Sequence, residues 1–169
     1  MTLAEVPEGS AIFIDANIFI YHFVGASPQC TALLARCETA EVRGATSVLV
    51  LAEVAHRLMM IEAVERKLVP PGNVARRLAG RPELVRRLTV YEASLQAIPS
   101  MGVEILALTE AMFQLGLRQQ RRYGLLTNDS LIVASMLQQG VRVLATADRR
   151  LAIVDELAIV VPTDLASAS

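Results

Sequence analysis

The chain has 169 residues, which is enough for one domain with a sizeable hydrophobic core. Hydrophobic residues make up 53% of the sequence and charged residues 20%, a balance that excludes an intrinsically disordered protein. The formal net charge of −1 gives no overall attraction to nucleic acid or to a membrane surface. No uncharged apolar run approaches the roughly 20 residues of a membrane span. No basic N-terminal region typical of a signal peptide is present, so we expect a cytoplasmic protein with no membrane contact.

Short apolar runs alternate with helical patterns from end to end, which is typical of a mostly parallel sheet covered by helices on both faces. The first run, Ala11 to Ile14, is continuously apolar and predicts a strand buried on both faces. Ser27 and Pro28 predict a helix start, because serine caps an N-terminus and proline suits the first helical position. Strands are expected at 10–16, 44–47, 103–108, 141–146 and 158–161, and helices at 17–24, 28–39, 48–68, 109–122, 129–139 and 149–156.

Residues 70–98 fit this alternation least well. They begin with Pro70-Pro71-Gly72, which ends the preceding helix, and continue with helical pieces rich in arginine. We therefore expect a single domain over residues 1–169, with 70–98 as a helical, arginine-rich insert or arm. Fifteen of the sixteen basic residues are arginine, which suits forked contacts to phosphate. The arginine clusters are either phosphate-binding surfaces or solvated helix faces, and the sequence leaves both interpretations open.

Four acidic residues fall where strands end or helices begin. Asp15 ends the first strand and Asp148 ends the fourth. Glu53 and Asp129 lie near the starts of two helices. Right-handed crossovers place the carboxyl ends of parallel strands at one edge, so we expect these acids to converge there.

Converging carboxylates repel one another, because each raises the pKa of the next, and a divalent cation relieves that repulsion. Oxygen ligands without Cys or His are those that Mg²⁺ or Mn²⁺ prefers. Such a metal site supports phosphodiester cleavage by lowering the pKa of a bound water.

Each acid also has a purely structural explanation. Asp15 and Asp129 stand at helix starts, where a carboxylate can cap free N–H groups, and capping is compatible with metal binding. Glu53 could be a solvent-facing helical residue, and Asp148 a turn acid beside two arginines. Glu53 and His56 have the E-x-x-H spacing of di-iron bundles, but a single pair in an α/β fold predicts no such centre.

The acids lie in four short segments: Phe13-Ile-Asp-Ala-Asn17, Thr46-Ser-Val-Leu-Val-Leu-Ala-Glu-Val54, Thr127-Asn-Asp-Ser-Leu-Ile-Val-Ala134 and Ala145-Thr-Ala-Asp148. Together these segments resemble the PIN-domain nucleases, and most closely the VapC-type toxins of prokaryotic toxin–antitoxin pairs. The resemblance covers about residues 10–162. It implies a three-layer α/β/α, PIN-like fold with a parallel five-stranded sheet in the order 3-2-1-4-5.

The resemblance also assigns roles residue by residue. The catalytic and metal-binding acids of the family fall on Asp15, Glu53, Asp129 and Asp148, and the cofactor would be Mg²⁺ or Mn²⁺. The polar residues that would orient the ligands or the water from behind them are Asn17, Ser47 and Thr146. Independently of the resemblance, the arginine clusters supply the candidate RNA-binding residues, which are Arg81, Arg86, Arg87 and Arg149.

The implied function is a metal-dependent endoribonuclease, the toxin of a type II toxin–antitoxin pair, with RNA as substrate, a cognate antitoxin as partner and a homodimer as assembly. Two alternatives stay open: a housekeeping PIN nuclease in RNA processing, and a catalytically silent PIN-fold scaffold that binds RNA or protein. A receiver domain is disfavoured, because it needs a lysine after a late strand and Lys67, the single lysine, falls in the helix expected at 48–68. An Asp-x-Asp phosphatase is disfavoured because Asn17 stands where the second acid belongs.

Overall fold

The computed structural model describes residues 1–165, and a parallel sheet lies at its centre. The strands are β1 (Ala11–Ile14), β2 (Arg43–Ser47), β3 (Val103–Leu106), β4 (Val143–Ala145) and β5 (Ala158–Val160). They lie in the order β3-β2-β1-β4-β5, and every neighbouring pair is parallel. This confirms the predicted sheet and its strand order, with β1 in the middle.

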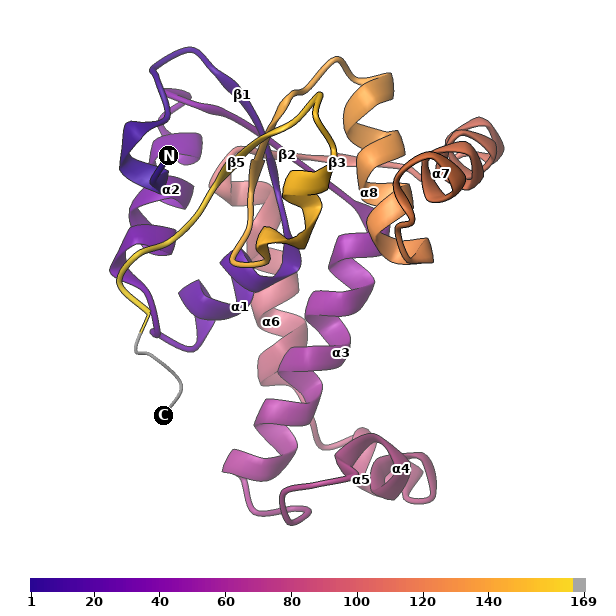
Figure 1. Cartoon of the computed structure of the whole chain (residues 1–169). Coiled ribbons are helices and arrows are strands. Elements are labelled where there is room, and N and C mark those ends of the chain that lie inside the picture. Colours follow the sequence, from indigo (N-terminus) through magenta and orange to yellow (C-terminus); the bar gives the residue numbers. More distant parts are fainter. Residues whose placement is uncertain (166–169) are drawn as a thin grey trace.

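Helices lie on both sides of the sheet, with α2 on one side and α8 on the other (Figure 1). The α-helices are α1 (Ala16–Phe23), α2 (Pro28–Glu38), α3 (Val48–Glu65), α4 (Val74–Ala79), α5 (Pro82–Val85), α6 (Val90–Ala97), α7 (Glu110–Tyr123) and α8 (Thr127–Gln138). The 3₁₀ helices are η1 (Leu3–Glu5), η2 (Ile98–Met101) and η3 (Arg149–Ile153). The last of these lies within the short helical stretch expected at 149–156 and ends three residues earlier.

Within residues 1–165 no single helix is long and apolar enough to cross a membrane, although α1 and α2 pass that test as a pair bent by 106°.

The hydrophobic core is built around β1. Ile12, Phe13 and Ile14 each have 0% exposure, because β2 and β4 flank the strand and helices cover both faces. Leu144 of β4 and Phe19 of α1 belong to the same cluster of buried side chains. A charged side chain within this buried strand would be costly. The acidic residue Asp15 comes directly after the strand's last residue, Ile14.

The longest helix, α3, begins at the carboxyl edge of the sheet and extends well beyond it (Figure 1). Its far end carries α4 and α5 and a second, small hydrophobic cluster that includes Ala63, Leu78 and Leu88. From there α6 returns along α3 toward the sheet. The segment 70–98, expected as one insert, therefore falls in two parts of the structure. Residues 70–89 belong to a tip, which we define as residues 66–89, and the rest is mainly the return helix α6.

A buried carboxylate ties the return helix to α3. Glu62 is 4% exposed and accepts hydrogen bonds from the backbone N–H groups of Thr89, Val90 and Tyr91, each at 3.0 Å. The Arg66 guanidinium donates to the same carboxylate at 2.8 Å. Since Thr89 makes no capping bond with its own side chain, Glu62 supplies the acceptors that the N-terminus of α6 needs.

Replacing Glu62 with glutamine should lower the free energy of unfolding by roughly 2–3 kcal/mol, because an amide keeps only one acceptor oxygen and leaves Arg66 without its counter-charge. Burial acts to raise the pKa of Glu62, but hydrogen bonds from Tyr91, Thr89 and Arg66 outweigh burial and the pKa is lowered. The stabilisation is therefore present above the unfolded-state pKa of about 4.3, and it is lost as the pH falls through the lower folded-state pKa.

Urea unfolding at pH 7 measures this loss. Glu65→Gln is the matched control, because Glu65 is exposed on the same helix. Equal stability of the two variants would contradict the role assigned to Glu62.

Candidate metal centre

A cleft of about 390 Å³ opens where the strands end, and all four predicted acids line it. They are Asp15, Glu53, Asp129 and Asp148. The topology explains the convergence: β1 and β4 are adjacent and parallel, so the residues that follow them lie at the same edge, and α3 and α8 begin nearby. The structure thus brings the four acids together, and their chemical roles stay predictions.

Asp15 is the most enclosed of the four acids, at 8% exposure. Its carboxylate accepts hydrogen bonds from the Ala16 backbone N–H at 2.7 Å, the Asn17 amide at 2.7 Å and the Thr146 hydroxyl at 2.6 Å. By accepting the bond from Ala16, Asp15 caps the N-terminus of α1, and the same residue also lines the cleft. Burial raises the pKa of Asp15 and the Asp148 charge adds to the rise, against the opposing effect of these hydrogen bonds.

Asn17 and Thr146 fasten the segment after β4 to the start of α1. The Asn17 amide donates to the Thr146 hydroxyl oxygen at 3.0 Å, and its own carbonyl oxygen accepts the Ala147 N–H at 2.8 Å. The Thr146 oxygen also accepts the Asp148 backbone N–H at 2.9 Å. These bonds connect the end of β1 to the last acid, so two of the three residues predicted to orient the ligands, Asn17 and Thr146, contact the acidic cluster.

Ser47, predicted to act with them, lies at a different place. It is the N-cap of α3, where its hydroxyl accepts the Val50 N–H at 3.4 Å, and within residues 1–165 it bonds none of the four acids. Its effect on Glu53 is to set where α3 begins. The neighbouring Thr46 is fully buried and donates its hydroxyl to the carbonyl oxygen of Ile14 at 2.8 Å, directly before the first acid. Thr46 is not among the predicted site residues, and the signal that could have identified it is a hydroxyl group inside a buried strand.

Glu53 and Asp129 have free carboxylates. In the described part of the chain neither side chain has a hydrogen-bond partner, and both are partly exposed. For Asp129 this argues against the capping interpretation, since α8 begins after Leu126 without a side-chain cap. Burial raises the pKa of both groups, and the charge of Asp15 raises each further.

Two arginines, Arg57 and Arg150, bring positive charge into the cleft, and neither is among the predicted RNA-binding residues. Arg57 lies one helical turn after Glu53 on α3 and partly offsets the rise in its pKa. The Arg150 Nε donates to both oxygens of Asp148, at 3.0 and 2.8 Å, and its Nη2 donates to one of them as well. This pairing lowers the pKa of Asp148. The spacing of each arginine from its acid was a signal that the sequence contained.

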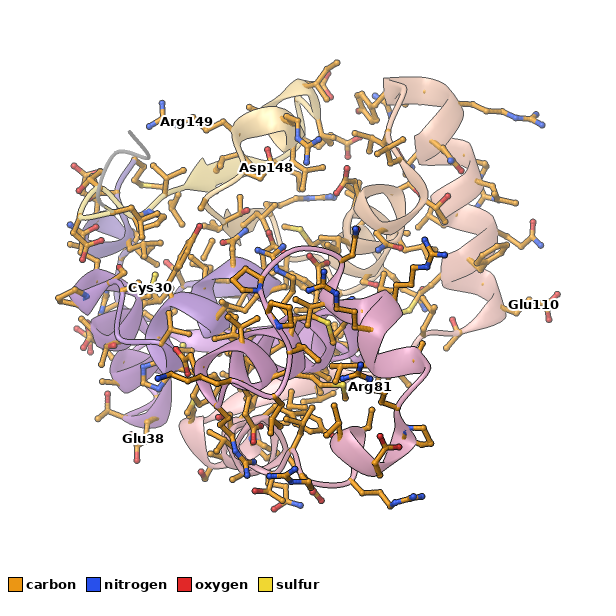
Figure 2. All side chains as sticks on the ribbon, turned by 90° about the horizontal axis from the view of Figure 1, so that it is seen from below. Cys30, Glu38, Arg81, Glu110, Asp148 and Arg149 are labelled. Carbon is orange, nitrogen blue, oxygen red and sulfur yellow. The ribbon has the colours of Figure 1, made fainter. Side chains whose placement is uncertain are left out.

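The arginines that were chosen lie outside the cleft lining. Arg149 lines a separate hollow beside Met1 and Val161, and Figure 2 shows it at the rim of the molecule. Arg81, Arg86 and Arg87 belong to the tip at the far end of α3. Contact of these residues with RNA stays a prediction.

The donor set suits a hard divalent cation by its chemistry. Four carboxylates without Cys or His are the oxygen donors that Mg²⁺ and Mn²⁺ prefer, and the raised pKa values of three of them reflect burial and mutual repulsion that a cation would relieve. Among residues 1–165, however, no group of three or more His, Cys, Asp or Glu side chains is arranged to hold an ion. Asp148 in particular is turned onto Arg150. The four carboxylates are chemically suited to bind a divalent cation. In this arrangement, however, no three of them are positioned to bind one ion together.

Comparison with known proteins places this architecture in context. A family model described as PIN domain matches residues 12–157. Among solved structures, VapBC2 from Rickettsia felis bound to a promoter DNA fragment is 15% identical, with 90% of this chain and 98% of that chain covered and a TM-score of 0.60. A toxin–antitoxin complex from Klebsiella pneumoniae is 19% identical, with 88% and 96% covered and a TM-score of 0.57.

A third solved structure is VapC20 from Mycobacterium tuberculosis, described as a sarcin-ricin loop cleaving toxin. It is 13% identical, with 85% of this chain and 94% of that chain covered and a TM-score of 0.56. At these identities the likeness concerns the fold alone. No curated protein matched the chain.

Replacing Asp129 with asparagine should stabilise the metal-free protein at pH 7, by less than about 1 kcal/mol because solvent screens this partly exposed group. The amide removes a carboxylate whose pKa is raised by burial and by neighbouring acids. A raised folded-state pKa penalises the ionised form, so the gain is present at pH 7, shrinks as the pH falls through the raised folded-state pKa, and is lost below the unfolded-state pKa of about 3.9.

Urea unfolding in EDTA at pH 7 and pH 4 measures this gain. Glu104→Gln, an exposed change on β3, is the control and should leave stability unchanged. A destabilised Asp129→Asn protein at pH 7 would argue against repulsion within the cleft.

Proposed function

The chain belongs to the PIN domain family, and from this membership we propose that it is a metal-dependent endoribonuclease, the toxin of a type II toxin–antitoxin pair. PIN-domain nucleases are hydrolases that act on nucleic acids and generally use a divalent metal. The observation that carries the proposal is the convergence of four carboxylates and two arginines in one cleft at the carboxyl edge of the sheet.

In this function the four acids Asp15, Glu53, Asp129 and Asp148 would hold Mg²⁺ or Mn²⁺. When bound, the cation would polarise the scissile phosphate and lower the pKa of an attacking water. Asn17 and Thr146 keep the Asp15 carboxylate in a fixed orientation through bonds of 2.7 and 2.6 Å. Ordered ligands lower the cost of assembling the site, because less side-chain freedom is lost when a cation enters.

The two arginines of the cleft would act on the substrate. Arg57 and Arg150 both line the cleft, so each can offset the repulsion between the acids and an incoming phosphate. Neither His22 nor His56 lines the cleft, and although the charge of His56 acts on Glu53, we propose neither imidazole as a general base. Proton transfer would therefore involve the carboxylates and water.

We also propose a cognate antitoxin, a homodimeric assembly and a cytoplasmic location. The similar structure from Klebsiella pneumoniae is a toxin–antitoxin complex, which supports a partner of that kind. An antitoxin that reaches into the acidic cleft would keep the enzyme silent. A housekeeping PIN nuclease would use the same cleft without such a partner, and the breadth of RNA cleavage separates the two.

The purified protein should cleave total cellular RNA or tRNA into discrete fragments with Mg²⁺ or Mn²⁺ and should not cleave in EDTA. Glu53→Gln should reduce the rate by about 100-fold or more, the expected loss when one ligand of a catalytic cation is removed. Glu53 is preferred to Asp15 as the test residue, because Asp15 also holds three hydrogen bonds that the fold uses.

Glu104→Gln should retain full activity and serves as the matched control. Cleavage focused on one RNA would support the toxin function, and cleavage of many RNAs would favour a housekeeping nuclease. A folded protein, free of a copurified antitoxin, that cleaves no RNA with either metal would overturn the proposed activity.

Arg150→Ala should tighten Mn²⁺ binding by about two- to fivefold, the effect expected when one exposed ion pair no longer competes for Asp148. Isothermal titration calorimetry measures this without RNA. Arg149→Ala is the matched control, since the neighbouring arginine lines a separate hollow. Weaker Mn²⁺ binding by Arg150→Ala would show instead that the guanidinium holds Asp148 in a binding orientation.

A further inference from the structure

The tip, residues 66–89, concentrates positive charge that the rest of the chain lacks. It contains seven of the sixteen basic residues and one of the seventeen acidic residues, so its formal charge is +6 and that of the other 145 residues is −7. The net charge of −1 for the whole chain conceals this separation. A strongly positive surface on an otherwise acidic protein attracts polyanions to that surface alone.

Four guanidinium groups of the tip are free to bind a ligand. Within residues 1–165 the exposed side chains of Arg76, Arg81, Arg86 and Arg87 make no ion pair and no side-chain hydrogen bond. The other two tip arginines have internal roles. Arg66 pairs with Glu62 at 2.8 Å, and Arg77 donates to the carbonyl oxygen of Pro70 at 2.9 Å.

The tip is a folded element with its own packing. Val69, Leu78 and Leu88 are each at most 3% exposed and form its small core with Ala63 of α3. Its end at Thr89 is held by the Glu62 carboxylate. The arginines therefore project from a fixed surface, and ordering that surface costs little when a ligand binds.

The tip lies at a set distance from the cleft. Glu53 in the cleft and Glu65 at the end of α3 are twelve residues apart on one helix, which corresponds to roughly 18 Å along its axis. Figure 1 shows α3 running uninterrupted between the two regions, and Figure 2 labels Arg81 on the tip. At about 3.4 Å per nucleotide of a stacked strand, this separation corresponds to about five nucleotides.

We propose that the tip is a second RNA-binding site, which holds the phosphate backbone about five nucleotides from the scissile bond and thereby selects long or folded RNA over short oligonucleotides. This site depends on the proposed ribonuclease function of the cleft. We favour RNA over an acidic protein segment as the ligand of the tip. An RNA whose scissile phosphate lies in the cleft has further phosphates on both sides of it, and these can reach the tip. The acidic body repels that polyanion, and arginine forks on the tip recover the affinity.

Binding is measured by fluorescence anisotropy with labelled tRNA and a labelled hexanucleotide pool, in a Glu53→Gln background that prevents cleavage. The triple change Arg81→Gln/Arg86→Gln/Arg87→Gln should weaken tRNA binding at least about tenfold. It should also reduce the slope of log affinity against log salt by about two, since each phosphate contact contributes about 0.7 to 0.9.

The matched control is Arg43→Gln/Arg118→Gln/Arg121→Gln, which removes the same charge from exposed positions outside the tip. An equal loss of tRNA binding in the two triple variants would overturn the site, because net charge alone would then explain the effect. Unchanged tRNA binding by the tip variant would overturn it as well. Urea unfolding checks that both variants remain folded.

Cleavage in the active background tests the length selection. The ratio of kcat/KM for tRNA to kcat/KM for the hexanucleotide pool should fall about tenfold in the tip variant and stay constant in the control variant. RNA binding that depends on the tip, without any cleavage, would contradict the proposed ribonuclease function and support the tip as an RNA-binding site. If the protein cleaves RNA but the tip variant shows unchanged tRNA binding and an unchanged kcat/KM ratio, the ribonuclease function would be supported and the tip site contradicted.

Discussion

A carboxylate enclosed at the end of the central strand is the constraint on which the site depends. Asp15 follows three fully buried residues of β1, where an ionised group is costly unless hydrogen bonds or a cation compensate it. The donors come from Ala16 and Asn17 of α1 and from Thr146 after β4. Satisfying one carboxylate therefore fixes a strand end, a helix start and a distant loop relative to one another. The cleft forms where these three meet.

Charge within the cleft is compensated unequally. Asp148 is paired with Arg150, whereas within residues 1–165 the carboxylates of Glu53 and Asp129 have no hydrogen-bond partner. Burial is the largest cause of the raised pKa of Glu53 and of Asp129. A cation entering such a cleft would find some ligands free and one already paired with a guanidinium. A phosphate entering with it would offer that guanidinium a new partner. In the proposed nuclease, the metal would thus compensate the negative charge of the free carboxylates, and the phosphate of the substrate would compensate the positive charge of Arg150.

One helix connects the two charged regions of the molecule. The first turns of α3 carry Glu53 and Arg57 at the cleft, and its last turn carries Glu62, which holds the far end of the tip. A continuous helix keeps these regions at a constant separation. The acidic cleft and the basic tip can therefore act on one extended polyanion without an intervening hinge.

The sequence by itself determined the alternating strands and helices and the convergence of four acids, because apolar runs, helix caps and the common edge of parallel strands are local or topological signals. The family resemblance added the strand order. Only the tertiary structure decided the polar pairings: Arg150 instead of Arg149 enters the cleft, Ser47 caps α3 instead of contacting the acids, and Glu62 is buried under α6. Such pairings depend on side-chain direction at element ends and on packing between segments far apart in the chain, and no local periodicity contains that information.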